Sequence, residues 1–212
     1  DASPDRAPDD YVSEFFDWYA DHFESHLTEN LKYIGPQEVA KALRTVRPDG
    51  VGHLIDLGCG TGLAGVALAG LASRLTGVDL SGAMLERAKA TGAYANLVQL
   101  DLVSALQAQA DGVAEAAVAV DVLVYVGVVE SVFAELKPVL AIDGVLIATF
   151  EEGDHIEDWD LSAAGRYRHT EDYLRKTAAN AGLEVISISR TSLREEYEVP
   201  VPSLIATFQK RG

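Results

Sequence analysis

The stretch His53-Leu-Ile-Asp-Leu-Gly-Cys-Gly-Thr-Gly62 decides the fold of this 212-residue chain. Apolar residues lead up to Asp56, and three glycines then follow at every second position, before a segment with helical periodicity. Glycine is needed in such a turn because the backbone bends tightly and approaches a ligand without Cβ atoms in the way. The pattern predicts a strand over His53–Leu57, a ligand-binding turn, and a helix over Leu63–Ala72.

Short apolar strands and helical stretches alternate along the chain up to Phe150. Near-continuous apolar runs such as Ala116–Val120 fit strands that are buried on both faces. The alternation predicts repeated β–α–β units and a parallel sheet with helices on both faces. The further strands expected here are 74–79, 97–100, 116–123 and 145–150, and the further helices are 82–90 and 128–140.

The C-terminal part breaks this alternation. A helix is expected over Thr170–Ala181, with Gly182 as its C-cap. Strands are expected over Leu183–Ser189 and Leu204–Phe208, and the prolines between them leave no helical period, so these strands should form an antiparallel hairpin. The predicted fold class is therefore α/β, with a doubly wound, mostly parallel, seven-stranded sheet over residues 51–212.

The N-terminal part predicts a helical cap over residues 11–50, after a loose segment over residues 1–10 that is rich in Asp and Pro. One apolar stripe recurs at every fourth position and comprises Tyr11, Phe15, Tyr19, Phe23 and Leu27. The stripe fits a core-facing helix, and it also fits a lid in which Tyr19, Phe23 and the later Tyr33 close over a ligand. Pro36 is placed at the start of the next helix.

Two kinds of ligand compete for the glycine turn. Gly60-Thr-Gly-Leu-Ala-Gly65 matches the dinucleotide pattern, with Asp79 at about the expected 20 residues further on. Asp56 argues against a dinucleotide, because a carboxylate at the strand end repels a pyrophosphate and attracts a cationic group such as an α-ammonium. An NAD(P)-dependent oxidoreductase remains the alternative interpretation.

Four motifs together resemble those of class I S-adenosylmethionine-dependent methyltransferases. Asp56-Leu-Gly-Cys-Gly-Thr-Gly62 resembles their first motif, and Val78-Asp-Leu-Ser81 followed by Met84 resembles the second. Gln99-Leu-Asp-Leu102 resembles the third, and the strand that runs into Asp121-Val-Leu123 resembles the fourth. The resemblance covers residues 51 to about 150. It implies a Rossmann-like domain that uses S-adenosylmethionine and releases S-adenosylhomocysteine.

The resemblance implies a role for each matching residue. The loop of Gly58, Cys59, Gly60 and Gly62 wraps the methionine part, with Asp56 near its ammonium group. Asp79 accepts hydrogen bonds from both ribose hydroxyls. Leu80 and Met84 pack on the adenine. Asp101 accepts a hydrogen bond from the adenine amino group, and the backbone of Leu102 donates one to the ring. Asp121 borders the methyl-transfer site.

A narrower resemblance concerns the predicted methyltransferase domain often found behind tetratricopeptide repeats. It rests on Asp21–Leu27 before Tyr33-Ile-Gly-Pro36, on Asp121–Gly127, on Gly165–His169, and on Leu193–Glu196 with Pro200-Val201. Val128 departs from it, because an acidic residue is expected there. This chain carries no such repeats, which fits a stand-alone member or a trimmed N-terminal portion. The subgroup implies no particular acceptor.

Charge and composition limit the partners. The formal net charge is −16, so the surface repels nucleic-acid phosphates and anionic lipid, and a small-molecule acceptor is expected instead. The single cysteine, Cys59, excludes an internal disulfide and fits a reducing, cytoplasmic compartment. No apolar run is long enough to cross a membrane. The sequence says nothing of the oligomeric state.

The candidates for proton transfer are few. His169 and Tyr167 lie in Gly165-Arg-Tyr-Arg-His169 after the fifth strand, where the connection emerges at the ligand-binding edge of the sheet, so both are candidate catalytic residues. His169 also fits a capping role, and Arg166 fits either an acidic substrate or local charge balance. His53 is expected to be structural. No metal is expected, because His22 and His26 lack the Glu of a zinc motif and the acidic run 151–160 fits a solvated loop.

The sequence therefore predicts a small-molecule methyltransferase. Two rivals remain: the NAD(P)-dependent oxidoreductase, and a non-catalytic, cofactor-binding interaction module. Fold alone does not decide among them, because function depends on the site.

Overall fold

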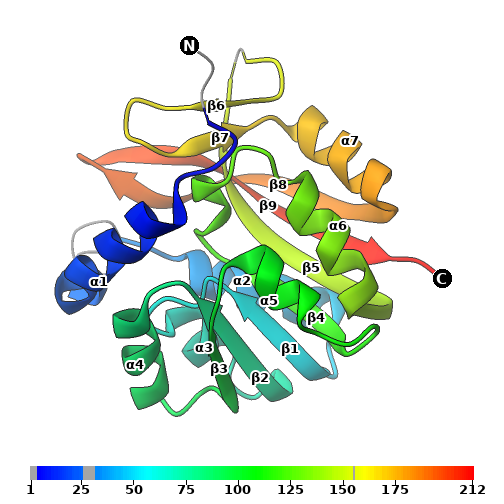
Figure 1. Cartoon of the computed structure of the whole chain (residues 1–212). Coiled ribbons are helices and arrows are strands. Elements are labelled where there is room, and N and C mark those ends of the chain that lie inside the picture. Colours follow the sequence, from blue (N-terminus) through cyan, green and yellow to red (C-terminus); the bar gives the residue numbers. More distant parts are fainter. Residues whose placement is uncertain (1–3, 26–31, 155) are drawn as a thin grey trace.

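The computed structural model describes residues 4–25, 32–154 and 156–212, without the side chains of Tyr19 and of residues 21–25. Its centre is one mixed sheet in the order β3-β2-β1-β4-β5, continued by β9 and β8 (Figure 1). The strands of this core are β1 (Val51–Leu57), β2 (Ala72–Asp79), β3 (Asn96–Gln99), β4 (Ala114–Ala119), β5 (Leu140–Glu152), β8 (Leu183–Glu196) and β9 (Val199–Lys210). Strands β1 to β5 are parallel, and β9 pairs antiparallel with both β5 and β8. The predicted fold class is confirmed.

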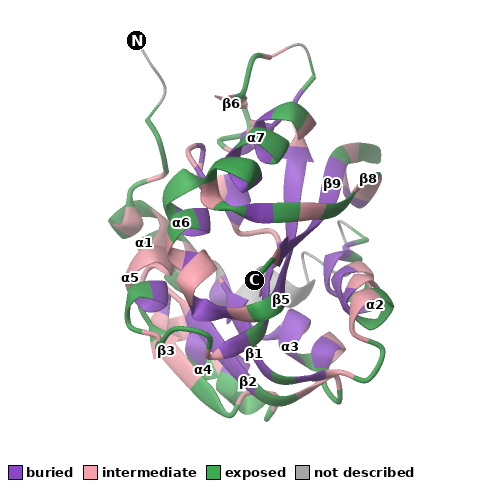
Figure 2. Ribbon diagram, turned by 90° about the vertical axis from the view of Figure 1, so that its right-hand side faces the viewer, coloured by how far each residue is buried: buried purple, intermediate pink, exposed green. Residues whose placement is uncertain are grey.

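Helices cover both faces of the sheet. Helices α2 (Gly35–Val46) and α3 (Leu63–Leu68) pack on one face through Val39, Leu43 and Leu68. Helices α5 (Leu102–Gln107), α6 (Glu130–Val139) and α7 (Glu171–Ala181) cover the other face. Helix α4 (Gly82–Ala90) packs against β2 and β3. Figure 2 shows the buried residues gathered along the strands and the inner sides of these helices.

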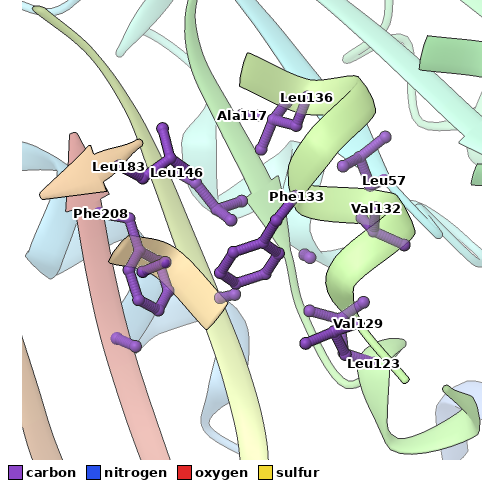
Figure 3. Close-up of a cluster of buried hydrophobic side chains, with 14 of the residues drawn as sticks. Leu57, Ala117, Leu123, Val129, Val132, Phe133, Leu136, Leu146, Leu183 and Phe208 are labelled. Carbon is purple, nitrogen blue, oxygen red and sulfur yellow. The ribbon is translucent and has the colours of Figure 1, made fainter. Parts of the chain in front are cut away.

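The larger hydrophobic cluster lies between the sheet and helices α5 to α7. Phe133 of α6 meets Phe208 of β9 edge to face, with 5.0 Å between the ring centroids. Leu146 and Leu136 pack beside this pair (Figure 3). Burying these large side chains contributes about 1.5–3 kcal/mol each, which makes the sheet a rigid support for the loops at its edge.

Several boundaries agree with the prediction, and their caps explain why. Thr170 caps α7 by accepting from the Tyr173 backbone N–H, and Gly182 ends the helix in the left-handed conformation, at φ 71°. The predicted helix over Leu63–Ala72 is shorter, because Gly70 turns the chain at φ 79° and β2 begins at Ala72. The predicted strand over 116–123 ends earlier, at Ala119, and a 3₁₀ turn, η2, spans Leu123–Tyr125.

Besides the η2 turn, the sequence did not predict helix α5 or the two short strands that follow β5. Helix α5 begins at Leu102, after Asp101 has accepted from the backbone N–H groups of Val103 and Ser104. A short hairpin of β6 (Trp159–Leu161) and β7 (Tyr167–His169) follows β5, and β7 pairs with the end of β5. Among the described residues the sheet therefore has nine strands, and the seven predicted ones form its core.

Helix α1 (Asp9–Ser25) lies across the edge of the sheet at the carboxyl ends of β1 to β3 and packs against α4 (Figure 1). The segment before it, which was predicted to be loose, pairs with the chain after β4. Ala7 donates its backbone N–H to Tyr125 O at 2.9 Å, and Gly127 N–H donates to Asp5 O at 2.8 Å. We call residues 4–7 the N-terminal strap.

Candidate functional site

A cavity opens at the carboxyl ends of the parallel strands, beneath the strap and α1. The loops after four strands line it, although Gly62 itself does not. The lining residues are Gly58–Thr61, Leu63 and Ala64 after β1, Asp79 and Leu80 at the end of β2, Leu100–Val103 after β3, and Val120–Val122, Tyr125 and Val126 after β4. Open α/β sheets bind their ligands at this edge. Arg6, Asp9, Val12 and Phe16 close the cavity from the strap and α1.

The glycine loop has the backbone that its sequence requires. Gly58 lies at φ 70°, and a Cβ on it would come within 2.3 Å of Val122 Cγ2, so no other residue fits there without a rearrangement. Gly62 lies at φ 96° and precedes α3. Both conformations are open to glycine at little cost. The loop therefore passes close beneath the cavity, and Gly58, Cys59 and Gly60 line it.

Asp79 fixes this loop to the neighbouring one. Its Oδ2 accepts from Gly60 N–H at 2.8 Å, and its Oδ1 accepts from Ser81 N–H at 2.9 Å. Burial raises the pKa of Asp79, while the backbone N–H donors act to lower it. Each carboxylate oxygen has a second lone pair, so the group can still accept two hydrogen bonds from a ligand.

Thr61 is a site residue to which the sequence prediction gave no role. It lines the cavity and is 1% exposed, and its Oγ1 has no hydrogen-bond partner within the described residues. A buried hydroxyl without a partner costs free energy, so it fits a site where a polar ligand supplies the missing bond. Thr61 stands inside the predicted glycine motif, and only its burial distinguishes it from a turn residue.

The predicted adenine-side residues come together. Leu80, Met84, Leu102 and Asp101 all line the cavity. Met84 is 1% exposed, so it also belongs to the packed interior. Asp101 caps α5. Desolvation acts to raise the pKa of Asp101, but hydrogen bonds from Ser104, the charge of Arg6 and the Val103 N–H together hold it below its ordinary value. The capping role and the ligand-facing role of Asp101 are compatible, because the caps use Oδ1.

Asp56 departs from its predicted place. Its side chain is fully buried and does not line the cavity. Oδ2 accepts from the Tyr94 hydroxyl at 2.6 Å, and Oδ1 has no partner within the described residues. Burial raises the pKa of Asp56 to about 7, although the hydrogen bond from Tyr94 lowers it. Asp56 therefore supports the glycine loop from below, and its predicted contact with an ammonium group loses its geometric basis. The electrostatic case against a dinucleotide, which rested on Asp56, loses that basis too.

His169 and Tyr167 are also displaced from their predicted role. His169 is fully buried, with Nε2 at 3.0 Å from Gly127 O, and it lies between the rings of Phe150 and Tyr173. Burial lowers its pKa to about 4. Tyr167 is 1% exposed and donates its hydroxyl to Pro4 O at 2.7 Å. Neither lines the cavity, because β7 turns both side chains into the packed interior, so they support the loop after β4 and the strap.

The structure describes one of the three predicted lid side chains. Tyr33 lines the cavity, whereas the side chains of Tyr19 and Phe23 lie outside the described residues. The stripe that begins at Tyr11 and Phe15 faces outward, since these residues are 61% and 37% exposed. Its neighbours Val12 and Phe16 face the cavity instead, and Phe16 meets Tyr125 edge to face at 5.4 Å. The residues of α1 that line the cavity thus lie one position after the predicted ones, and the lid role stays a prediction.

Asp121 and a set of charges beside it complete the site. Asp121 lines the cavity at φ 57°, a strained conformation for a residue other than glycine, and its backbone N–H donates to Thr149 Oγ1 at 2.8 Å. Its Oδ1 accepts from Arg194 Nη1 at 2.6 Å. Arg166, a predicted substrate residue, does not line the cavity but pairs with Glu151 and Glu196. This favours the predicted alternative of local charge balance.

The described residues contain no group of three or more His, Cys, Asp or Glu side chains placed to hold a metal ion. His22, His26 and His155 lie outside the described side chains. His53 accepts or donates at both ring nitrogens, to Val113 O and Thr76 Oγ1, which agrees with its predicted structural role. No helix among the described residues is long and apolar enough to cross a membrane.

Comparison with known proteins agrees with this geometry. Residues 55–148, from β1 into β5, match the family model of the methyltransferase domain. No curated protein sequence matches the chain. This match agrees with the predicted S-adenosylmethionine-dependent methyltransferase, and one similar structure described below holds S-adenosylhomocysteine.

Solved structures confirm the fold. The 1,6-didemethyltoxoflavin-N1-methyltransferase of Burkholderia thailandensis, with S-adenosylhomocysteine bound, has a TM-score of 0.76 at 18% identity and covers 100% of this chain and 94% of its own. The [4+2]-cyclase SpnF has a TM-score of 0.77 at 17% identity, with 98% of each chain covered. Magnesium protoporphyrin IX methyltransferase from Synechocystis PCC 6803 has a TM-score of 0.69 at 18% identity, covering 95% and 99%.

Proposed function

We propose that this chain transfers a methyl group from S-adenosylmethionine to a small, largely apolar molecule. The cavity at the strand ends carries the proposal, because it joins the glycine loop, Asp79 and Asp101 on one side to the apolar wall of Phe16 and Tyr125 on the other. The bound cofactor would supply an electrophilic methyl group on a sulfonium. The first side suits the cofactor, and the second suits an acceptor.

The residues that would hold the cofactor fit its chemistry. Asp79 can accept from two ribose hydroxyls while it keeps both backbone donors. Leu80, Leu100 and Leu102 offer an apolar slot for the adenine, next to the Asp101 carboxylate. The buried Thr61 hydroxyl, which lacks a partner within the described residues, belongs to the glycine loop that would hold the methionine part.

The acceptor side would act through positioning and exclusion of water. Methyl transfer is an in-line displacement, and alignment of the reacting atoms can supply about 7–11 kcal/mol of the barrier. Helix α1 covers the cavity and is fixed to the cofactor side, since Asp17 Oδ1 accepts from Ser81 Oγ at 2.5 Å and from Ala83 N–H at 3.2 Å. A closed lid of this size favours a small acceptor over a macromolecule.

Two similar folds carry names of small-molecule methyltransferases, one acting on a toxoflavin precursor and one on magnesium protoporphyrin. The similar fold named a cyclase shows that the architecture serves other chemistry as well. The acidic surface supports an acceptor that is neither nucleic acid nor lipid headgroup. The finer resemblance to the domain found behind tetratricopeptide repeats remains part of this proposal.

The first experiment is a calorimetric titration with S-adenosylhomocysteine, with NAD in a parallel cell. We expect S-adenosylhomocysteine to bind and NAD to give no heat of binding. Asp79→Ala should weaken S-adenosylhomocysteine binding at least about tenfold, by loss of the ribose hydrogen bonds. Binding of NAD alone would overturn the proposal in favour of an oxidoreductase. Binding without methyl transfer to any acceptor would favour the interaction module.

A further inference from the structure

A buried set of charges stands directly behind the acceptor side of the cavity. Arg194 of β8 is 4% exposed and makes three contacts: with Asp121 at 2.6 Å, with Glu196 at 3.1 Å, and with Glu151. Arg166 pairs with the same Glu151 and Glu196. We call these five residues the Arg194 network.

The Arg194 network carries one negative charge in excess, since it holds three carboxylates and two guanidiniums. Asp121 is the network member that lines the cavity. Arg194 donates to Asp121 Oδ1, and the backbone N–H of Asp121 donates to Thr149 Oγ1. The guanidinium therefore holds the Asp121 carboxylate in one orientation, at the border of an otherwise apolar wall.

The other polar groups near Asp121 are poor bases. Burial raises the pKa of Tyr33 and of Tyr125, and the Asp121 charge raises both further, so both phenols stay protonated. His53 and His169 are the histidines whose side chains are described, and neither lines the cavity. A hydroxyl acceptor usually needs a base such as histidine, and no described histidine side chain lines the cavity.

A nitrogen acceptor has different needs. Its lone pair attacks without prior loss of a proton, and positive charge then develops on the nitrogen. A fixed carboxylate aimed at developing positive charge stabilises the transition state more than the ground state.

We infer that the acceptor atom is an uncharged nitrogen on a small apolar scaffold, and that Asp121, held by Arg194, stabilises the charge that this nitrogen gains. The inference rests on the proposed function. The nitrogen lone pair forms the bond to the methyl carbon, and the carbon–sulfur bond breaks with its electron pair left on sulfur. The positive charge moves from sulfur to nitrogen. The N–H proton, hydrogen-bonded to Asp121, leaves to water after transfer.

The test uses matched aromatic amines and phenols of equal size, beginning with 5-aminoindole and 5-hydroxyindole. Each compound is titrated into the protein loaded with S-adenosylhomocysteine and is assayed for transfer of labelled methyl from S-adenosylmethionine. We expect the amine of a pair to bind or react at least about tenfold better. In Asp121→Asn this preference should disappear, while the affinity for S-adenosylhomocysteine stays within about twofold of the parent.

Two further variants separate the network from general stability. Arg190→Gln, on the same strand and in an exposed ion pair with Glu152, should keep the amine preference. Arg194→Lys keeps the charge but cannot make three contacts from one planar fork, so it should reduce the preference with unchanged S-adenosylhomocysteine affinity.

Several outcomes overturn the inference. The inference is wrong if the parent binds and methylates amine and phenol equally well, or if it binds neither. A loss of S-adenosylhomocysteine affinity in Asp121→Asn as large as the loss for the amine also overturns it, because the carboxylate would then serve the cofactor. Failure of the parent to bind S-adenosylhomocysteine at all would instead overturn the proposed function, which keeps the two failures apart.

Discussion

The Tyr94 hydroxyl donates to Asp56 Oδ2 at 2.6 Å and accepts from Gly65 N–H at 3.1 Å. One phenol thus joins the end of β1 to the helix that follows the glycine loop. The pair lies beneath the loop rather than in the cavity, so its effect on ligand binding is indirect.

Tyr94→Phe should lower the free energy of unfolding by about 1–3 kcal/mol at pH 8, because it leaves a charged, buried carboxylate without its donor. At pH 5 the loss should be smaller, because Asp56 is then protonated. Urea unfolding at both pH values measures the difference. Tyr197→Phe, at a 99% exposed position, is the control. An equal loss at both pH values would contradict the assigned charge on Asp56.

Asp56→Asn should reveal the pH dependence of that carboxyl. Its folded pKa, about 7, lies above its ordinary value of 3.8, so the folded state binds the proton more tightly. The stabilisation that this gives is present below about pH 4 and is lost as the pH rises to about 7. Asparagine does not titrate. As the pH rises from about 4 to about 7, the free energy of unfolding of the variant should therefore increase by on the order of 4 kcal/mol relative to that of the parent. A constant difference between the two proteins would disprove the raised pKa.

His169→Gln should show the opposite sign. The folded pKa of His169, about 4, lies below the ordinary value of 6.5, so the parent loses stability as the pH falls from about 6.5 to about 4. Over the same fall in pH, the free energy of unfolding of the glutamine variant should increase by on the order of 3 kcal/mol relative to that of the parent. Methyl-transfer activity per folded molecule should be unchanged. A large loss of that activity would restore His169 as a catalytic candidate.

Thr61→Val should separate ligand binding from stability. The Thr61 hydroxyl has no partner within the described residues, so its removal should leave the ligand-free unfolding free energy equal or higher. Affinity for S-adenosylhomocysteine should fall about five- to tenfold, as expected for one lost hydrogen bond. Calorimetry measures both parent and variant. Thr45→Val, whose hydroxyl donates to Lys41 O within α2 at 3.0 Å, is the matched control. Unchanged affinity in Thr61→Val would remove this residue from the site.

Asp17→Ala should loosen the lid. The variant lacks the acceptor that joins α1 to Ser81 and Ala83. Limited proteolysis should then cut α1 at least about threefold faster than in the parent, because cleavage follows the population of locally opened chain. Glu14→Ala, an exposed position on the same helix, provides the comparison. Equal cleavage rates in all three proteins would show that Asp17 does not hold the lid.

The sequence predicted the parallel core because glycines and buried strands leave periodic signals. The turn from Leu57 to Gly62 and the cap residues Thr170 and Gly182 lie where expected, since each acts through its immediate neighbours. The β6–β7 hairpin was missed because strands of three residues are too short to show alternation. Helix α5 had a readable signal in Asp101 followed by Ser104, but that aspartate was assigned to the ligand.

The site divides in the same way. Residues at strand ends, such as Asp79 and Asp121, follow from topology, and both line the cavity. Whether a side chain on a connecting segment points inward depends on tertiary packing. For this reason the sequence could not show that His169 and Tyr167 are buried in the interior. Arg194 belongs to the Leu193–Glu196 segment of the narrower resemblance, but that segment was given no role, and Arg194 lies 73 residues from Asp121 in the sequence. Its contact with Asp121 arises only when β9 brings β8 beside the sheet.

The N-terminal strap has a consequence for how often the enzyme can turn over. It is held to residues 125–128 by three backbone hydrogen bonds, and to Tyr167 by one side-chain bond. The sheet beneath it is held by dozens of packed side chains. Opening the strap therefore requires far less free energy than opening the domain. For the proposed methyltransferase, we therefore expect spent cofactor to leave when residues 4–7 detach while the sheet stays intact, and we expect the rate of this opening to limit the catalytic cycle.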